Sequence, residues 1–180
     1  MPARVLILAL ARVSMLAVLV LPATVTPPSA VARSTQAAID ANDPVPVPAD
    51  LTALEPQVRA YLQPFIEKAR NAPADPDARA TLGLVYAANG LWTPARACFA
   101  EALRSAPSNR QAHYYLGIAT AALGNFDASL AIYRDVAARF PDFAPSQHRL
   151  GDALLMAGDS DGAMEAFERT IKLAPTKPPG

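Results

Sequence analysis

One spacing recurs through the second half of the chain, where three leucine–glycine pairs follow one another at a constant interval. The pairs are Leu82-Gly83, Leu116-Gly117 and Leu150-Gly151. Two further landmarks share this interval, and they are Gly90, Gly124 and Gly158 together with Pro107, Pro141 and Pro175. Three landmarks with one period indicate an internal repeat, in which each copy is a small structural unit that stacks on its neighbours.

Each copy is predicted to be a pair of helices, A and B. A glycine inside a helix costs about 1 kcal/mol relative to alanine, so Gly117 needs a compensating reason in packing. We expect the leucine–glycine site of helix A to let helix B approach closely, with an aromatic ring of helix B filling the space between them. The second glycine of each copy is predicted to end helix A as a left-handed cap. Thr93-Pro94 is typical of a helix start, so helix B of the first copy is predicted to begin there.

The first copy reads Leu82-Gly83-x-x-Tyr86, then Ala95-x-x-x-Phe99, then Pro107, and this pattern resembles the tetratricopeptide repeat. A period of about 34 residues is usual for that family. The resemblance implies an all-α fold, a right-handed superhelical stack of helix-turn-helix repeats at 76–109, 110–143 and 144–177. The usual first tryptophan of the pattern is replaced by Arg79, His113 and Gln147. The repeat-packing residues it implies are Leu82, Gly83, Tyr86, Ala95, Phe99, Leu116, Gly117, Phe126, Tyr133, Leu150, Gly151, Ala163 and Phe167.

The resemblance also implies a function, because helix A of such repeats lines a groove that holds a peptide or a helix of a partner protein. The groove positions would be Ala80, Leu84, Ala87, Tyr114, Ile118, Ala121, His148, Asp152 and Leu155. Members that grip a C-terminal carboxylate carry Lys and Asn where this chain has Ala80 and Leu84, so an apolar partner segment is expected instead. The chain is therefore predicted to be an adaptor or scaffold protein.

Residues 1–32 are predicted to be a signal peptide. Arg4 and Arg12 precede an apolar stretch, and Ala30-Val31-Ala32 offers a cleavage site after Ala32. The protein is therefore expected to be exported to the periplasm or secreted. The alternative is that this segment stays uncleaved as a membrane anchor, and we expect no other contact with a membrane. However, Arg12 interrupts the apolar run and leaves it shorter than the roughly 20 residues that span a bilayer.

Two segments lead from there to the first repeat. Residues 33–50 are predicted to be a disordered proline-rich leader with little core of its own, because Pro44, Pro46 and Pro48 favour an extended backbone. Residues 51–75 are predicted to hold a capping helix, Glu55–Asn71, which resembles a helix B and is interrupted by Pro64. Its apolar stripe would consist of Val58, Tyr61, Leu62, Phe65, Ile66 and Ala69.

No arrangement of residues predicts catalysis, a cofactor or a metal. The sequence lacks a phosphate-binding loop and a nucleophile with a partner base. Asp159-x-Asp161-Gly162 lacks the rest of a calcium loop and is expected to cap a helix, while His113 and His148 lack a third ligand. The 16 basic and 16 acidic residues balance, which gives no electrostatic footprint for nucleic acid.

Two features suggest interactions outside the groove. Cys98 is the one cysteine, and we expect it at a half-buried apolar position of helix B. Through this thiol the alternative to an adaptor is a thiol-dependent or disulfide-linked envelope component. The last repeat has no capping helix after it, so self-association or docking of a partner is expected through apolar residues at that end. These are Leu155, Met164, Phe167 and Ile171. The alternative is that the tail at 178–180, with Lys177, folds back over them.

Overall fold

The computed structural model describes residues 45–48 and 50–173. The predicted signal peptide, most of the leader and the tail at 178–180 lie outside the described residues. The described elements are η1 (Leu51–Ala53), α2 (Pro56–Asn71), α3 (Pro76–Ala88), α4 (Trp92–Ser105), α5 (Arg110–Ala122), α6 (Phe126–Arg139), α7 (Ala144–Met156) and α8 (Ser160–Leu173). None of these helices is long and apolar enough to cross a membrane.

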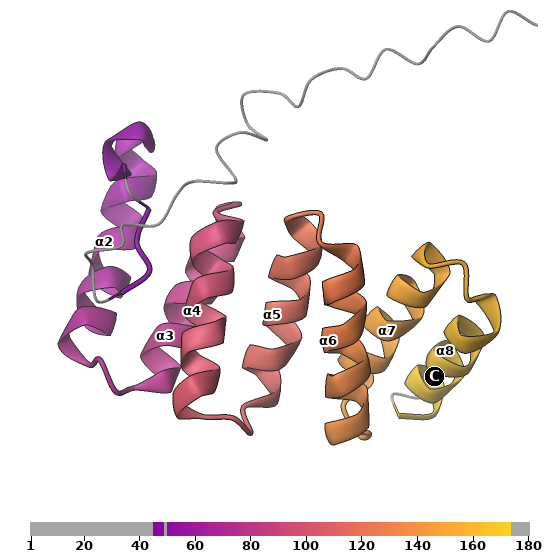
Figure 1. The fold of residues 1–180 in the computed structure, drawn as a ribbon. Helices are drawn as coiled ribbons and strands as arrows, with labels where there is room; N and C mark the ends of the chain where they lie inside the picture. Colours follow the sequence, from indigo (N-terminus) through magenta and orange to yellow (C-terminus); the bar gives the residue numbers. More distant parts are fainter. Residues whose placement is uncertain (1–44, 49, 174–180) are drawn as a thin grey trace, which may run out of the picture.

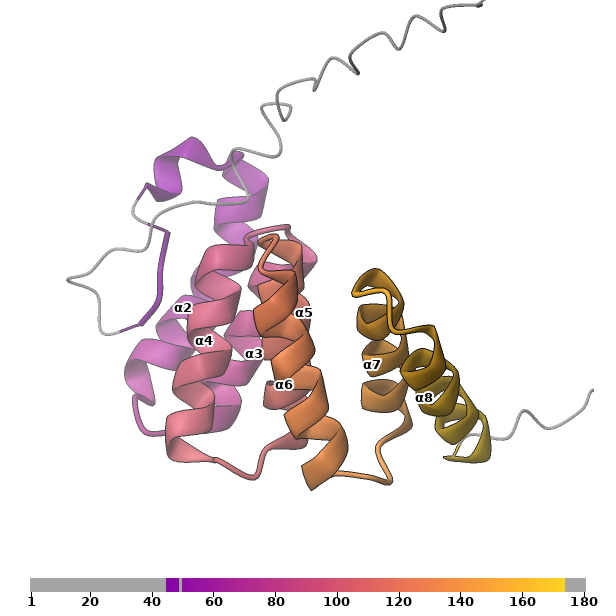
Figure 2. The same ribbon diagram turned by 45° about the vertical axis from the view of Figure 1, so that its right-hand side comes forward.

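The fold is an all-α stack of three antiparallel helix pairs, α3–α4, α5–α6 and α7–α8, preceded by α2 (Figure 1). Each helix packs against the next one in the chain, from α2 through to α8 (Figure 2). The first helices of the pairs begin at Pro76, Arg110 and Ala144, which keep the interval of the leucine–glycine pairs. The predicted fold class is therefore confirmed, although α4 begins at Trp92 rather than after a Thr93 cap.

Side-chain caps and glycine turns set the helix ends. Asp75 and Asn109 accept hydrogen bonds from backbone amides in the first turns of α3 and α5, and Asp159 accepts one from the amide of Gly162 at 2.9 Å. The predicted left-handed turns are confirmed, because φ is 73° at Gly90, 81° at Gly124 and 83° at Gly158. Each turn joins the two helices of one repeat.

The leucine–glycine glycines lie under the aromatic rings of the second helices. A Cβ atom added at Gly83 would lie 2.8 Å from Cε1 of Phe99, and one added at Gly117 would lie 2.5 Å from Cε1 of Tyr133. A Cβ at Gly151 would lie 2.5 Å from Cε1 of the Phe167 ring. Since real Cβ contacts are longer than this, the three helix pairs pack at a separation that only glycine permits at these positions.

The core is concentrated in the N-terminal half. One cluster of buried residues joins α2, α3 and α4 to part of α5, and its largest members include Leu62, Ile66, Leu82, Tyr86 and Phe99. The cluster of the C-terminal half contains Leu130, Leu154, Ala163 and Ala166, two of which are small. The stack is therefore better buried at its N-terminal end than at its C-terminal end.

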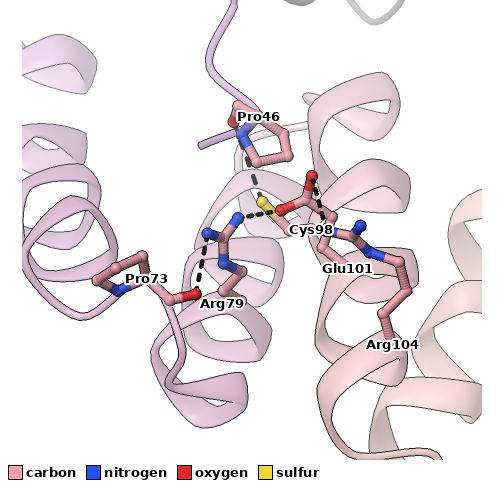
Figure 3. A network of polar contacts seen from close by, with 6 residues as sticks. All are labelled: Pro46, Pro73, Arg79, Cys98, Glu101 and Arg104. Atoms are coloured by element: carbon pink, nitrogen blue, oxygen red, sulfur yellow. Dashed lines mark hydrogen bonds and ion pairs between the residues drawn. The ribbon is translucent and has the colours of Figure 1, made fainter. Parts of the chain in front are cut away.

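Residues 45–48, the N-terminal strap, correct the prediction of a leader without a core. All four residues are buried, and Val45 and Val47 belong to the cluster that holds Leu62 and Tyr86. In Figure 3 the strap passes beside α4, with Pro46 above Cys98. The prediction failed because it weighed only the prolines, whereas an extended backbone also places Val45 and Val47 on one side.

The capping helix also differs in part from its prediction. Leu62, Ile66 and Ala69 are buried as expected, but Tyr61 is 55% exposed and lies at the edge of the predicted stripe. Its ring packs against Phe65 on the same helix, with centroids 5.5 Å apart. The buried face of α2 is therefore narrower than the apolar pattern indicated.

Candidate functional site

The predicted groove positions lie on α3, α5 and α7, and the nine residues named above are called the inner groove from here on. Ala80, Ala87, Tyr114, Ile118, Ala121 and Asp152 are half-buried, whereas Leu84, His148 and Leu155 are exposed. The helices present these side chains because the positions recur at three- and four-residue steps on one helical face.

One hollow of the inner groove lies between the second and third repeats. Ala121 of α5 and Asp152 of α7 line it, together with Tyr133 of α6, Arg149 and Met156. Phe126, Ser129 and Ala153 complete its wall. Sequence reasoning missed Arg149 and Met156, although Met156 is four residues after Asp152 and so shares its helical face.

Charged and aromatic groups meet at this hollow. Asp152 lies 3.4 Å from Arg149 Nη1 and 3.8 Å from His148 Nε2. A hydrogen bond with Tyr114 raises the pKa of Arg149, and burial raises the pKa of Tyr133 to about 12. Tyr133 is therefore neutral near pH 7, and the hollow combines one cation, one anion and aromatic surface.

A second aromatic group flanks the hollow at the junction of the second and third repeats. The Tyr114 ring lies 5.1 Å from that of Tyr115 and 5.6 Å from that of Phe143, between centroids. Arg110 sits 5.0 Å above the Phe143 ring, within cation–π distance. These two edge-to-face contacts hold Tyr114 in one orientation beside Arg149.

The inner groove is more polar between the first and second repeats. Ala80 and Leu84 of α3 line a hollow there with Tyr115 and Gln111 of α5. The other five inner-groove residues line neither hollow, and they are Ala87, Tyr114, Ile118, His148 and Leu155. The structure thus brings Ala80 together with Leu84, and Ala121 with Asp152, but it does not join all nine residues into one site.

One of the residues expected to pack the repeats is misassigned. Phe126, predicted to belong to the repeat packing, is 51% exposed and lies at the rim of the hollow beside Met156. It is the first residue of α6, where the side chain has left the interface with α5. The other packing residues are buried or half-buried.

A partly buried ion pair stands where the family pattern has a tryptophan in the first repeat. Arg79 is 7% exposed, pairs with Glu101 and donates to the carbonyl oxygen of Pro73 at 3.2 Å (Figure 3). Arg104 approaches Glu101 at 3.9 Å from the exposed side. The network connects α3 to α4 on the side of Cys98. It therefore stabilises the packing of these two helices and does not line the inner groove.

Cys98 lies in the interior, which corrects its predicted half-buried position. Its side chain is fully buried, with Sγ 4.0 Å from the carbonyl oxygen of Pro46, and burial raises the pKa of the thiol far above its usual range. A thiol that is covered and protonated is a poor nucleophile. In this fold the Cys98 thiol is therefore not exposed for the thiol-dependent or disulfide-linked function named above as the alternative.

The end of the last repeat exposes apolar side chains. Leu155, Met164 and Ile171 are exposed at 51%, 59% and 68%, and Phe167 is half-buried against Gly151. Within residues 45–48 and 50–173 there is no group of three or more His, Cys, Asp or Glu side chains placed to hold a metal ion.

Solved structures with the same fold include several MamA proteins. A crystal structure of MamA is 22% identical, with a TM-score of 0.61 over 66% of this chain and 69% of that one. MamA from Desulfovibrio magneticus RS-1, residues 41 to the end, is 23% identical, with a TM-score of 0.60 over 68% and 69%. Identities this low show a common fold and nothing further. No curated protein matches the sequence.

The family profile described as "Tetratricopeptide repeat" matches residues 81–142 and again 121–178. These two matches together cover more than half of the chain, and they include the three leucine–glycine pairs and the three left-handed glycines. The chain belongs to the tetratricopeptide repeat family.

Proposed function

We propose that this protein is an exported scaffold that binds a partner protein through the inner groove. The observation that carries the proposal is the hollow between the second and third repeats, where Tyr133, Arg149 and Asp152 lie beside apolar Ala121 and Met156. Aromatic residues and arginine are the types that dominate binding energy at protein interfaces. Membership in a family of protein-binding repeats supports the same function.

The preferred ligand is a helix or an extended peptide with an apolar face and at least one charged residue. The apolar face would rest on Ala121 and Met156, and the charge would meet Arg149 or Asp152. A groove that already pairs its two charges does not demand a ligand of high net charge, because the Arg149–Asp152 contact is 3.4 Å. Binding is thus expected to depend only modestly on salt.

Site-directed photocrosslinking tests this proposal. A photoreactive amino acid at Ile118, on the inner groove, is expected to trap a discrete partner in cells, whereas one at exposed Ala138 of α6 is not. Ala121→Glu should abolish the Ile118 crosslink by placing a carboxylate in the hollow, and Ala138→Glu should leave it intact. Equal crosslinking from both positions, or indifference to Ala121→Glu, would overturn the proposal.

Export is part of the proposal and rests on residues 1–32, which lie outside the described residues. Cleavage after Ala32 would leave 14 of the 16 basic residues against 16 acidic ones, a slightly acidic mature protein. N-terminal sequencing of the exported protein is expected to begin at Arg33. A membrane-bound product that begins at Met1 would establish the uncleaved anchor instead.

The exposed end of the last repeat supports a second interaction, self-association. Met164 and Ile171 lie on α8 among the most exposed large apolar side chains of the described residues. Large exposed apolar patches are uncommon on monomers and tend to mark interaction sites. Light scattering is expected to show association with a second copy that Met164→Glu abolishes; a monomer at high concentration, unaffected by the substitution, would remove this interface.

A further inference from the structure

We propose that the outer face between α4 and α6 carries a second binding groove, which takes an extended partner segment of alternating aliphatic and proline residues. Ala97 and Ala100 of α4 form one wall, Ala128 and Ile132 of α6 form the other, and Leu116 and Thr120 of α5 form the floor. None of these residues belongs to the inner groove, so the site is additional to the proposed function.

The repeat itself identifies the ligand, because the chain already fills the equivalent place one repeat earlier. In the preceding copy, the positions of Leu116, Thr120 and Ile132 are occupied by Leu82, Tyr86 and Cys98. All three counterparts belong to the buried cluster that contains Val45 and Val47 of the N-terminal strap. The contact between Cys98 Sγ and the carbonyl oxygen of Pro46, at 4.0 Å, places the strap directly against one of them.

The walls correspond in the same way. Ala100 of the open groove is the counterpart of Ile66 on α2, which is 1% exposed in the filled one. The two grooves share α4, since Ala97 and Ala100 face the open groove while Cys98 faces the strap. The open groove is thus the direct continuation, by one repeat, of a surface that binds an extended Val-Pro segment within this molecule.

Two positions of the open groove carry smaller side chains than their counterparts in the filled one, whereas Ile132 is larger than its counterpart Cys98. The floor of the open groove carries Thr120 where the filled groove has Tyr86, and its wall carries Ala100 where the filled groove has Ile66. The Thr120 hydroxyl donates to the carbonyl oxygen of Leu116 at 2.7 Å, so it needs no partner from a ligand. Aliphatic side chains of valine size or larger therefore fit, and they lose no hydrogen bond on entering.

Charge at the rim further defines the partner. Arg96 lines one edge of the open groove, and in the chain's own sequence Asp43 and Asp50 flank the Val-Pro segment. An acidic residue beside the aliphatic–proline segment would meet Arg96. The corresponding hollow of the third repeat is lined by Arg134, Glu165 and Arg169, so it does not share this apolar character.

The occupant is a segment of another protein and not the strap of a second copy. Val45 and Val47 are 0% and 3% exposed in their own groove, so a strap that moved to a neighbouring molecule would uncover the core it now seals. A partner segment of the same chemistry pays no such cost.

A labelled synthetic peptide with the sequence of residues 43–50, DPVPVPAD, is the probe. Titrated into the purified protein, it is expected to bind saturably and to shift the methyl NMR signal of Ile132, in the open groove, while that of Ile66 stays unchanged. Ala100→Glu should weaken binding about tenfold or more, because its carboxylate would lie against the apolar peptide side chains and would compete with the peptide's aspartate for Arg96. Ala138→Glu is the matched control on α6 and should have no effect.

Three results would overturn the proposal. These are the absence of saturable binding, binding that Ala100→Glu leaves unchanged, and a shift of Ile66 in place of Ile132, which would mean that the peptide only exchanges with the strap. A peptide with aspartate in place of both valines should not bind. Ala121→Glu, in the inner groove, should leave the titration unaltered, so the outcome is independent of the proposed function.

Discussion

Gly117→Leu is expected to lower the free energy of unfolding by about 1–3 kcal/mol, the usual cost of overpacking a core. A Cβ at this position would lie 2.5 Å from Cε1 of Tyr133, whose side chain is 4% exposed and has little space to move. The loss should appear despite the helix propensity of leucine, which is about 1 kcal/mol better than that of glycine. Urea denaturation with a fixed slope would measure it.

Two further variants isolate the cause of this loss. Ala138→Leu adds the same bulk to an exposed position of α6 and should change stability little. Combining Gly117→Leu with Tyr133→Ala should cost less than the sum of the single substitutions, because the residues then no longer compete for one space. An unchanged midpoint for Gly117→Leu would mean that α5 and α6 do not meet at this glycine.

Val47→Asp is expected to release the N-terminal strap and to destabilise the protein by about 2 kcal/mol, the value of burying one valine side chain. Val47 is 3% exposed, so a carboxylate there would lose its water unless the strap leaves. Release would uncover Cys98, whose pKa burial now raises. The thiol should then react with a disulfide reagent near neutral to mildly alkaline pH at least tenfold faster, since an exposed cysteine has a pKa of about 8.5.

Ala53→Asp provides the comparison for this variant, because Ala53 is exposed in the neighbouring η1 helix. It adds the same charge nearby and should leave both stability and thiol reactivity close to those of the unmodified protein. If Val47→Asp left the reaction rate of Cys98 unchanged, the strap would not be what covers the thiol.

The repeat period was sufficient to predict the stack of helix pairs, because each copy carries its own landmarks at short range. The positions of Gly90, Gly124 and Gly158 predicted the left-handed turns, which depend on local backbone geometry alone. The strap was not predictable in this way. Proline alternation near Val45 is compatible with a free linker, and only the apolar surface of α2 and α4, far along the chain, makes the buried position favourable.

Long-range pairing also explains what was missed elsewhere. Arg79 occupies a position where the family pattern has an aromatic residue, and its burial depends on Glu101, which lies on the following helix. Arg149 of the candidate site forms a hydrogen bond with Tyr114, which lies on a helix of the preceding repeat. Both cases are side-chain pairs between helices, and a helical periodicity gives no information about them.

The two ends of the stack differ, and this limits the assemblies that the chain can build. Helix α2 and the N-terminal strap close one end, while the end formed by α8 exposes Met164 and Ile171. Head-to-tail growth into a filament requires two complementary ends, and the exposed large apolar side chains differ between the two, with Tyr61 on α2 and Met164 and Ile171 on α8. Contact between two copies of the same end is isologous and is satisfied by a twofold axis. The self-association proposed for the α8 end, if it pairs this surface with itself, would therefore give a symmetric dimer with both N-terminal ends pointing outward.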